Sequence, residues 1–200
     1  MIVSKKIDEE KYLIEHGRDL PYVEGLINKQ WVDDGIAYII LTKVMPDKRL
    51  IACIYVIDFL CTGLKKTEYF VGLSDAEYKN VKAGFRCAFS DIEKADIIFA
   101  HNMIYGSIKY AEKLGFKPCS NFKHTENLLD TDFIDEGIKS IEFGHLGKPL
   151  YVEYPDDNVD LIMKTLDHAV GKGNYDFILR SDETLDETFE DDCDDDNKDE

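Results

Sequence analysis

The sequence lacks the short motifs by which most phosphate-binding, proteolytic and zinc-dependent sites are recognised. It contains no G-x-G-x-x-G or G-x-x-x-x-G-K-[ST] loop, no H-E-x-x-H helix and no G-x-S-x-G turn. The histidines stand apart in the sequence, and no pair of potential ligands has the spacing of a zinc site. We therefore expect no metal and no cofactor, and any catalytic site must be assembled from residues that are distant in the chain.

Long apolar runs and paired cysteines are also missing. The longest apolar run, residues 50–57, is far shorter than the ~20 residues that a membrane-spanning helix needs. The first ten residues lack the apolar core of a signal peptide. The five cysteines are odd in number and form no C-x-x-C pair, which favours free thiols in a reducing compartment. These features predict a cytoplasmic protein with no membrane partner.

Basic residues are scarce, because 24 Lys and Arg stand against 41 Asp and Glu and the formal net charge is −17. Most of the excess lies in residues 181–200, whose twelve acidic residues and one basic residue give −11 and leave −6 for residues 1–180. Nucleic acids and anionic membranes are bound through clustered Lys and Arg. The composition therefore argues against both as partners.

Residues 181–200 contain only two large apolar residues, Leu185 and Phe189. So few apolar side chains cannot offset the entropy of ordering, and we expect a disordered acidic tail after a single domain of residues 1–180. Such a tail can serve solubility and spacing, or it can attract a basic protein partner. Leu185 and Phe189 lie four residues apart, so a short helix could form on binding.

The first half of the domain has the pattern of a sheet followed by helices. Residues 36–45 and 50–60 are rich in β-branched side chains and nearly continuous in apolarity, which predicts a hairpin at the centre of the sheet. Residues 67–72 predict a further strand. Two capping boxes, Ser74 with Glu77 and Ser90 with Glu93, each announce a helix.

The second of these helices should be the long one, because an apolar stripe at helical spacing runs from residue 92 to residue 114 and Gly115 follows it. Gly106 within it costs roughly 1 kcal/mol relative to Ala, which a close approach to a strand would explain. Later segments predict a helix over 120–129, a hairpin within 138–153, a helix from about 156 to 169 and a strand over 175–179. This order favours an α+β fold, with a central and mostly antiparallel sheet packed against a long buried helix.

Five residues form the candidate site. Asp58 interrupts an apolar strand, Cys61 and Lys65 follow it, and His101 and Tyr105 are four apart on one face of the long helix. If the helix crosses the strand end, a Cys–His or Asp–His pair could activate a nucleophile or a base. That predicts a hydrolase or nuclease-like enzyme of a mobile-element or defence locus. In the other interpretation Asp58 lies near solvent, His101 is a satisfied core histidine and Cys61 is a small apolar residue.

Two other sites have weaker support. Residues 109–118, K-Y-A-E-K-L-G-F-K-P, resemble a string found in small-molecule acetyltransferases, but the [RQ]-x-x-G-x-[GA] loop that holds coenzyme A in that class is absent. A metal site could draw on Cys61, His101, Cys119 or His124, although none of these residues is paired at the spacing of metal ligands.

Three segments together resemble a family of bacterial proteins, some members of which carry an added SEC-C metal-binding motif. They are I-D-F-L-C-T-G-L-K-K (57–66), A-H-N-M-I-Y-G-S-I-K-Y-A-E-K-L-G-F-K-P-C-S-N-F (100–122) and E-F-G-H-L-G-K-P-L-Y-V-E-Y-P-D-D-N (142–158). The family patterns are V-D-x-x-C-L-G-V-K-D, A-H-x-x-Y-G-A-x-x-Y-A-x-x-L-G-F-x-P-H-x-D-F and F-G-x-x-G-K-P-x-Y-x-x-G-P-x-D-D. The matching residues are Asp58, Cys61, Gly63, Lys65, His101, Tyr105, Gly106, Gly115, Phe116, Pro118, Phe122, Gly144, Gly147, Lys148, Pro149 and Asp156.

The chain departs from that family at four positions. Cys119 stands in place of His, Asn121 in place of Asp, Lys66 in place of an acid and Tyr154 in place of Gly, and the SEC-C cysteines are absent. The resemblance implies no particular activity. The favoured hypothesis is thus a non-enzymatic cytoplasmic interaction or regulatory protein whose acidic tail engages a basic protein partner.

Overall fold

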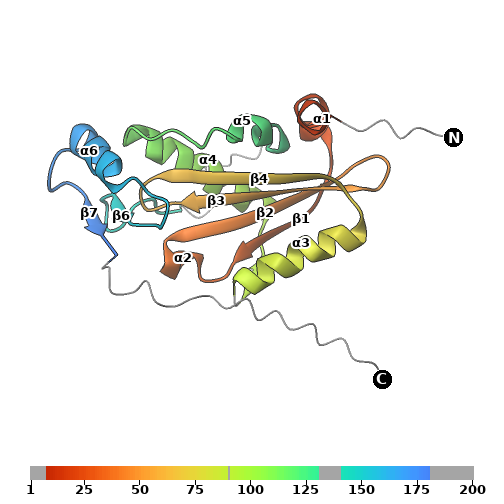
Figure 1. Cartoon of the computed structure of the whole chain (residues 1–200), viewed down its shortest axis with the longest axis horizontal. Coiled ribbons are helices and arrows are strands. Elements are labelled where there is room, and N and C mark those ends of the chain that lie inside the picture. The colour runs from red at the N-terminus through yellow and green to blue at the C-terminus, as the bar shows by residue number, and fades with distance from the viewer. Residues whose placement is uncertain (1–7, 90, 131–140, 181–200) are drawn as a thin grey trace, which may run out of the picture.

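The computed structural model describes residues 8–89, 91–130 and 141–180. Its centre is a five-stranded antiparallel sheet in the order β4-β3-β2-β1-β5, which confirms the predicted α+β class (Figure 1). The strands of this sheet are β1 (Tyr22–Asn28), β2 (Ile36–Val44), β3 (Leu50–Asp58), β4 (Gly63–Leu73) and β5 (Ile92–Lys94).

The predicted hairpin is confirmed as β2 and β3, which pair from Val44 opposite Leu50 to Ile36 opposite Asp58. Both strands are buried over most of their length because helices lie over both faces of the sheet. That double cover explains why their sequences are nearly continuous in apolarity instead of alternating. β4 is also confirmed, and it is longer than the strand predicted from residues 67–72.

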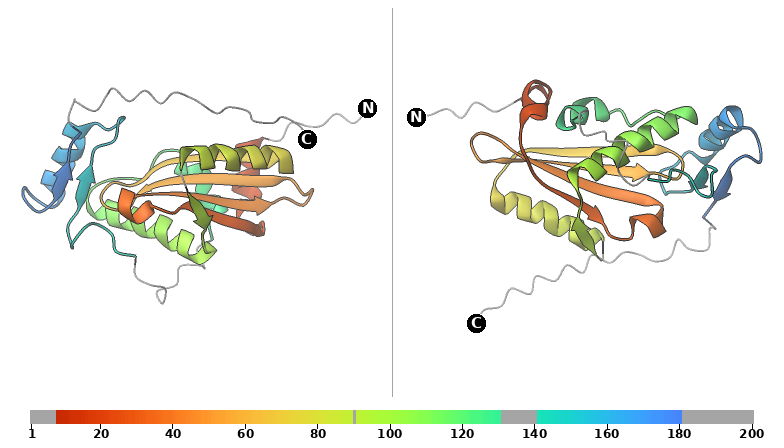
Figure 2. Two further views of the ribbon diagram at one scale, coloured as in Figure 1. Left: turned by 90° about the horizontal axis from the view of Figure 1, so that it is seen from below. Right: turned by 180° about the vertical axis from the view of Figure 1, so that it is seen from behind.

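Helices pack on both faces of the sheet, as Figure 2 shows. One face carries α4 (Ile97–Lys113), with α1 (Glu9–His16) and α5 (Phe122–Thr125) beside it, and holds the larger apolar cluster. We call it the α4 face. The opposite face, here the α3 face, carries α3 (Asp75–Ala88), which begins at the predicted capping box of Ser74 and Glu77.

The start predicted for α4 is wrong. Residues 92–94 form the edge strand β5, which pairs with β1, and the helix begins only after Asp96. The Asp96 carboxylate accepts hydrogen bonds from the backbone N–H groups of Ile98 and Phe99, so it is the N-cap. The sequence does not predict β1, and without that partner strand Ile92 fits as the first residue of the helical stripe.

Gly106 of α4 is explained by a side chain and not by a strand. A Cβ built on Gly106 would clash with the ring of Phe143. Only glycine at this position leaves room for that ring to pack against the helix. Gly115 ends the helix region with φ +87°, a left-handed conformation that suits glycine, as predicted. The predicted helix over 120–129 is split into α5 and a 3-10 turn, Glu126–Leu128.

The C-terminal part of the chain differs from its prediction. Among the described residues, β6 (Leu150–Val152) pairs in parallel with β7 (Asp176–Ile178) and not with residues 141–143, so the predicted hairpin is not found there. Parallel strands need a crossover connection, and α6 (Val159–Ala169) provides it. Asn158 caps this helix by accepting the N–H of Leu161, whereas the sequence also offered Asp156 or Asp157 as the cap. Residues 138–140 and the tail, residues 181–200, lie outside the described residues, and the boundary at 180 stays a prediction.

Of the helices that the structure describes, none is both long and apolar enough to cross a membrane.

Two remaining short elements complete the order, namely a 3-10 turn (Gly17–Asp19) and the single helical turn α2 (Trp31–Asp34). Gly35 ends α2 at φ +71°, where the chain reverses into β2. The core of the molecule therefore lies in and around the β2–β3 hairpin.

Candidate functional site

The structure divides the five predicted site residues between two places. Asp58, Cys61 and Lys65 lie at the turn between β3 and β4, whereas His101 and Tyr105 lie on α4 near Tyr22. Tyr22 is opposite Lys43 in β2 and Asp58 is opposite Ile36, and these seven steps correspond to about 23 Å along the sheet. The predicted convergence of Asp58 with His101 is therefore not found.

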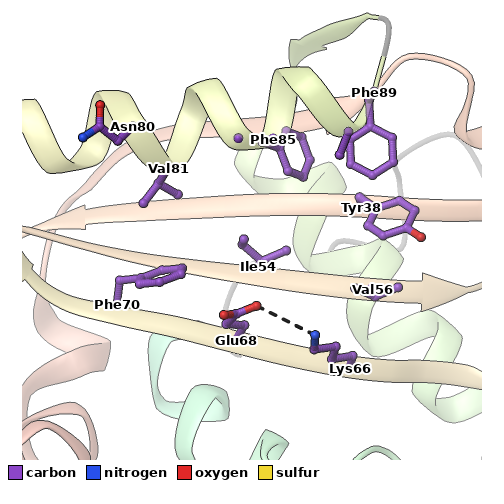
Figure 3. A pocket seen from close by; sticks show the side chains of 12 residues that line it. Tyr38, Ile54, Val56, Lys66, Glu68, Phe70, Asn80, Val81, Phe85 and Phe89 are labelled. Carbon is purple, nitrogen blue, oxygen red and sulfur yellow. Dashed lines mark ion pairs between the residues drawn. The ribbon is translucent and has the colours of Figure 1, made fainter. Parts of the chain in front are cut away.

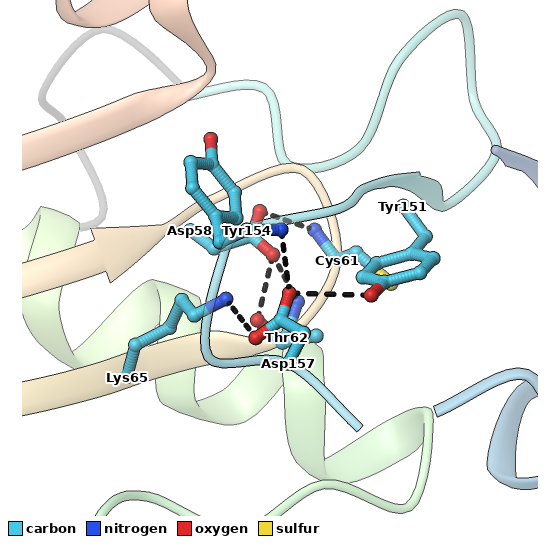
Figure 4. A network of polar contacts seen from close by, with 7 residues as sticks. All are labelled: Asp58, Cys61, Thr62, Lys65, Tyr151, Tyr154 and Asp157. Carbon is cyan, nitrogen blue, oxygen red and sulfur yellow. Dashed lines mark hydrogen bonds and ion pairs between the residues drawn. The ribbon is translucent and has the colours of Figure 1, made fainter. Parts of the chain in front are cut away.

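The Asp58 carboxylate holds the turn that follows its strand (Figure 4). It accepts hydrogen bonds from the N–H groups of Leu60 and Cys61, each at 3.0 Å, and from the N–H and hydroxyl of Thr62 at 2.9 and 2.6 Å. Asp58 is only 2% exposed, so it does not lie near solvent as one interpretation expected. Burial raises the pKa of its carboxyl, and the hydrogen bonds from Thr62 oppose that rise. These contacts give Asp58 a structural task.

The Cys61 side chain is buried in the apolar cluster that joins β6 and α6 to the rest of the domain. Its neighbours in that cluster include Leu114, Tyr151 and Leu166. Burial raises the pKa of the Cys61 thiol, and the charge of Asp58 adds to the rise. A catalytic cysteine needs the opposite shift, since the thiolate is the nucleophile. Cys61 therefore behaves as a small apolar residue.

Lys65 joins β4 to the segment before α6 (Figure 4). Its ammonium lies 2.6 Å from Asp157 Oδ1 and 4.3 Å from the centre of the Tyr154 ring. The other oxygen of Asp157 accepts hydrogen bonds from the Tyr151 hydroxyl at 3.2 Å and from the Tyr154 N–H at 3.0 Å. Asp157 and Tyr154 were not among the predicted site residues. These contacts connect β4 to the segment between β6 and α6. We call the four residues, Lys65, Tyr151, Tyr154 and Asp157, the polar clamp.

His101 is a buried and hydrogen-bonded core histidine. Its Nδ1 is 2.6 Å from the carbonyl of Ile97, which can only accept, so Nδ1 carries the proton. Its Nε2 then accepts the N–H of Asp130 at 2.9 Å, with the Tyr22 hydroxyl also at 2.9 Å. Burial lowers the pKa of His101 and favours the neutral ring. Tyr105 is partly buried against the same apolar cluster.

A buried lysine, Lys43, lies beside this histidine and is not among the predicted site residues. Its ammonium donates to the carbonyls of Gly17 and Arg18, each at 2.9 Å, and lies 4.2 Å from the centre of the Tyr22 ring. Burial lowers the pKa of Lys43 to about 8. The sequence does contain a signal for Lys43, because a lysine stands there within an otherwise apolar predicted strand. Its carbonyl partners close the end of a helical turn, so its contacts are structural as well.

An open groove lies on the α3 face, between α3 and the strands (Figure 3). Its volume is about 350 Å³, and its walls are mostly apolar and aromatic. A loose ion pair of Lys66 with Glu68, at 3.9 Å, lies on the β4 wall. We call this cavity the α3 groove, and it is lined by Tyr38, Ile54, Val56, Lys66, Glu68, Phe70, Asn80, Val81, Gly84, Phe85, Ala88 and Phe89.

A second cavity, of about 400 Å³, adjoins the α3 groove on the side of the polar clamp. The two cavities share Tyr38, Val56 and Lys66, and the second is completed by residues that include Lys65 and Tyr154. Cavities of this size are typical of ligand-binding clefts. The sequence signal for the groove is Gly84, which stands inside a well-capped helix where glycine is unfavourable.

Comparisons of the chain with family models, with curated proteins and with solved structures gave no match. The family resemblance set out above therefore stays a prediction. Within residues 8–89, 91–130 and 141–180, no three side chains of His, Cys, Asp and Glu are arranged to hold a metal ion. Among the described residues, the geometry thus offers two polar clusters whose groups bond to one another and an open, mostly apolar groove on the α3 face.

Proposed function

We propose that this protein is a cytoplasmic interaction module that binds an apolar-anchored peptide segment of a partner in the α3 groove. The observation that carries the proposal is Gly84. A glycine inside a helix costs ~1 kcal/mol relative to Ala, and a Cβ on Gly84 would meet no atom within 4 Å. No packing contact among the described residues accounts for the glycine, whereas a segment that lies close to the helix backbone would.

The chemistry of the groove supports a peptide anchored by apolar side chains. Its walls offer Val81, Phe85 and Phe89 from α3 and Ile54 and Phe70 from the strands. Aromatic and aliphatic pockets of this kind hold the anchor residues of amphipathic helices. The predicted catalytic residues, in contrast, are used in internal hydrogen bonds and packing, which favours binding over catalysis.

The acidic segment, residues 181–200, supplies a second binding element in this proposal. Its net charge of −11 suits a basic protein partner and would speed the encounter of the two proteins. The α3 groove would then provide the affinity that long-range charge alone does not give.

The sharpest test of the groove is Gly84→Phe in the full-length chain, with Gly84→Ala as the matched control. The phenylalanine ring would start from a Cβ that meets no described atom within 4 Å and would project into the groove that Gly84 lines. We expect Gly84→Phe to capture about tenfold less of the partners that the unchanged protein retains, which is a loss of about 1.4 kcal/mol. Gly84→Ala, which adds a single methyl group to the face that the bound segment approaches, should capture an intermediate amount. Equal partner recovery by all three proteins would overturn the groove as the binding site.

The acidic segment is tested separately, by pull-down with the full-length chain and with a chain in which its acidic residues are replaced by Asn and Gln. We expect the basic partners to be lost from the neutral variant and to be lost from the acidic protein at high salt, because surface charges are screened. Identical partners for both proteins would remove the role of the acidic segment and leave the groove proposal standing.

A further inference from the structure

We infer that the α3 groove has an occupant within this chain, namely residues 182–189, which lie just beyond the described residues. This inference rests on the proposed function of the groove and adds its regulation. The occupying segment would compete with partners, and a basic partner that binds its acidic residues would release the groove.

The described chain ends beside the groove system. The N–H of Arg180 donates to the Glu153 carboxylate at 2.9 Å, and the N–H of Glu153 donates to the Ile178 carbonyl at 2.9 Å. The residue after Glu153 is Tyr154, which lines the second cavity. That cavity adjoins the α3 groove through three shared lining residues, so the chain leaves Arg180 near the end of the groove system that Tyr154 lines.

The distance from Arg180 suits the next apolar residues. Leu185 is five residues beyond Arg180 and Phe189 is nine beyond it. With residues 181–182 extended at ~3.4 Å per residue and a helix from residue 182 at ~1.5 Å per residue, Leu185 and Phe189 can lie up to about 11 and 17 Å from Arg180. No long loop has to be closed before the segment begins.

The segment has the pattern of a groove-binding helix. Residues 182–189 read D-E-T-L-D-E-T-F, a four-residue unit repeated once, which sets Leu185 and Phe189 one helical turn apart. Residues four apart lie on one face of a helix, so the two apolar side chains can enter the groove together while the acidic residues face outward.

The walls of the groove match both parts of that pattern. The helix wall presents Asn80, Gly84 and Ala88, which are four residues apart and small or polar, so a second helix can lie close against it. On the strand wall, where the two cavities meet, Lys66 has a side chain that is 69% exposed and can pair with an outward carboxylate of the segment. These features together select the neighbouring D-E-T-L-D-E-T-F segment as the occupant.

The experiment uses the full-length chain and two readouts, the methyl NMR signals of the groove and the binding of the apolar dye anilinonaphthalene sulfonate. The test variant is Leu185→Ala with Phe189→Ala, and the matched control is Thr184→Ala with Thr188→Ala. We expect the test variant to shift the methyl signals of Ile54, Val56 and Val81 and to bind the dye more tightly. If the segment covers the groove ~90% of the time, the dye affinity rises about tenfold. The control should change neither readout.

Each other outcome overturns a defined part of the inference. Unchanged signals and dye affinity in the test variant, with dye binding abolished by Gly84→Phe, would exclude the segment and leave the groove as a binding site. Dye binding that Gly84→Phe does not alter would remove the proposed function as well. Methyl shifts that disappear on tenfold dilution would assign the occupant to a second copy of the chain and so overturn an occupant within the same chain.

Discussion

The two faces of the sheet differ in how completely they are covered, and one glycine on each face shows the difference. On the α4 face, the space beside Gly106 is filled by the ring of Phe143. On the α3 face, the space beside Gly84 meets no described atom within 4 Å and belongs to a groove of about 350 Å³. The same residue type in the same type of element thus has an internal explanation on one face and none on the other.

This difference separates packing from binding. The α4 face contains His101 and Lys43, whose polar groups are buried and hydrogen-bonded within the domain. The α3 face has fewer buried residues, and its apolar side chains remain partly accessible along the groove. Buried polar groups with satisfied partners stabilise one particular structure, whereas an open apolar groove leaves free energy for a ligand to gain.

The largest expected difference is in the free energy of unfolding, when the same substitution, Ile→Ala, is made on each of the two faces. Ile39 is fully buried on the α4 face, and Ile54 lines the groove. We expect Ile39→Ala to lower the free energy of unfolding by about 2–5 kcal/mol, because it leaves a cavity. Ile54→Ala should cost clearly less, since its side chain is already partly in contact with solvent. Urea unfolding of both variants measures this, and equal losses would show that the groove is closed in solution.

Alanine at the two helical glycines gives the next largest effect, with opposite signs. Gly106→Ala drives a methyl group into the Phe143 ring and should destabilise the protein by about 1–3 kcal/mol. Gly84→Ala adds only helix propensity and should stabilise it by ~1 kcal/mol. Thermal unfolding of both variants against the unchanged protein decides the matter. A loss for Gly84→Ala as large as that for Gly106→Ala would show that the space beside the two glycines is equally filled, and it would end the contrast between the two faces.

Local signals in the sequence predicted the elements whose causes are local. The apolar runs of residues 36–58 predicted β2 and β3, and the capping box of Ser74 and Glu77 predicted α3. Ser90 and Glu93 form the same motif but gave a false helix start, because residues 92–94 pair with β1, more than 60 residues away in the sequence. Likewise, the partner of β6 is β7 beyond α6, which no pattern near β6 reveals.

The candidate site shows the same limit. Asp58 stood out as a carboxylate in an apolar strand, but its backbone partners are the amides of Leu60, Cys61 and Thr62, and a backbone amide leaves no mark in a sequence. His101 is held by a helix carbonyl and by the N–H of Asp130, which are equally invisible. The one readable signal that matters for the groove was Gly84 in the interior of a capped helix.

The smallest expected effect is a pH dependence of stability on the α4 face, tested with His101→Gln. The folded protein keeps His101 neutral because burial lowers its pKa below the ordinary value of 6.5. Between that value and the lower folded pKa, the unfolded chain binds a proton that the folded chain does not, so stability should fall as the pH falls below 6.5. Glutamine can still accept the N–H of Asp130 but does not titrate. The variant should therefore lose this decline in urea unfolding between pH 7 and pH 5, even if it is less stable throughout. If the decline persists unchanged in His101→Gln, another group causes it, and the histidine does not distinguish the closed face from the open one.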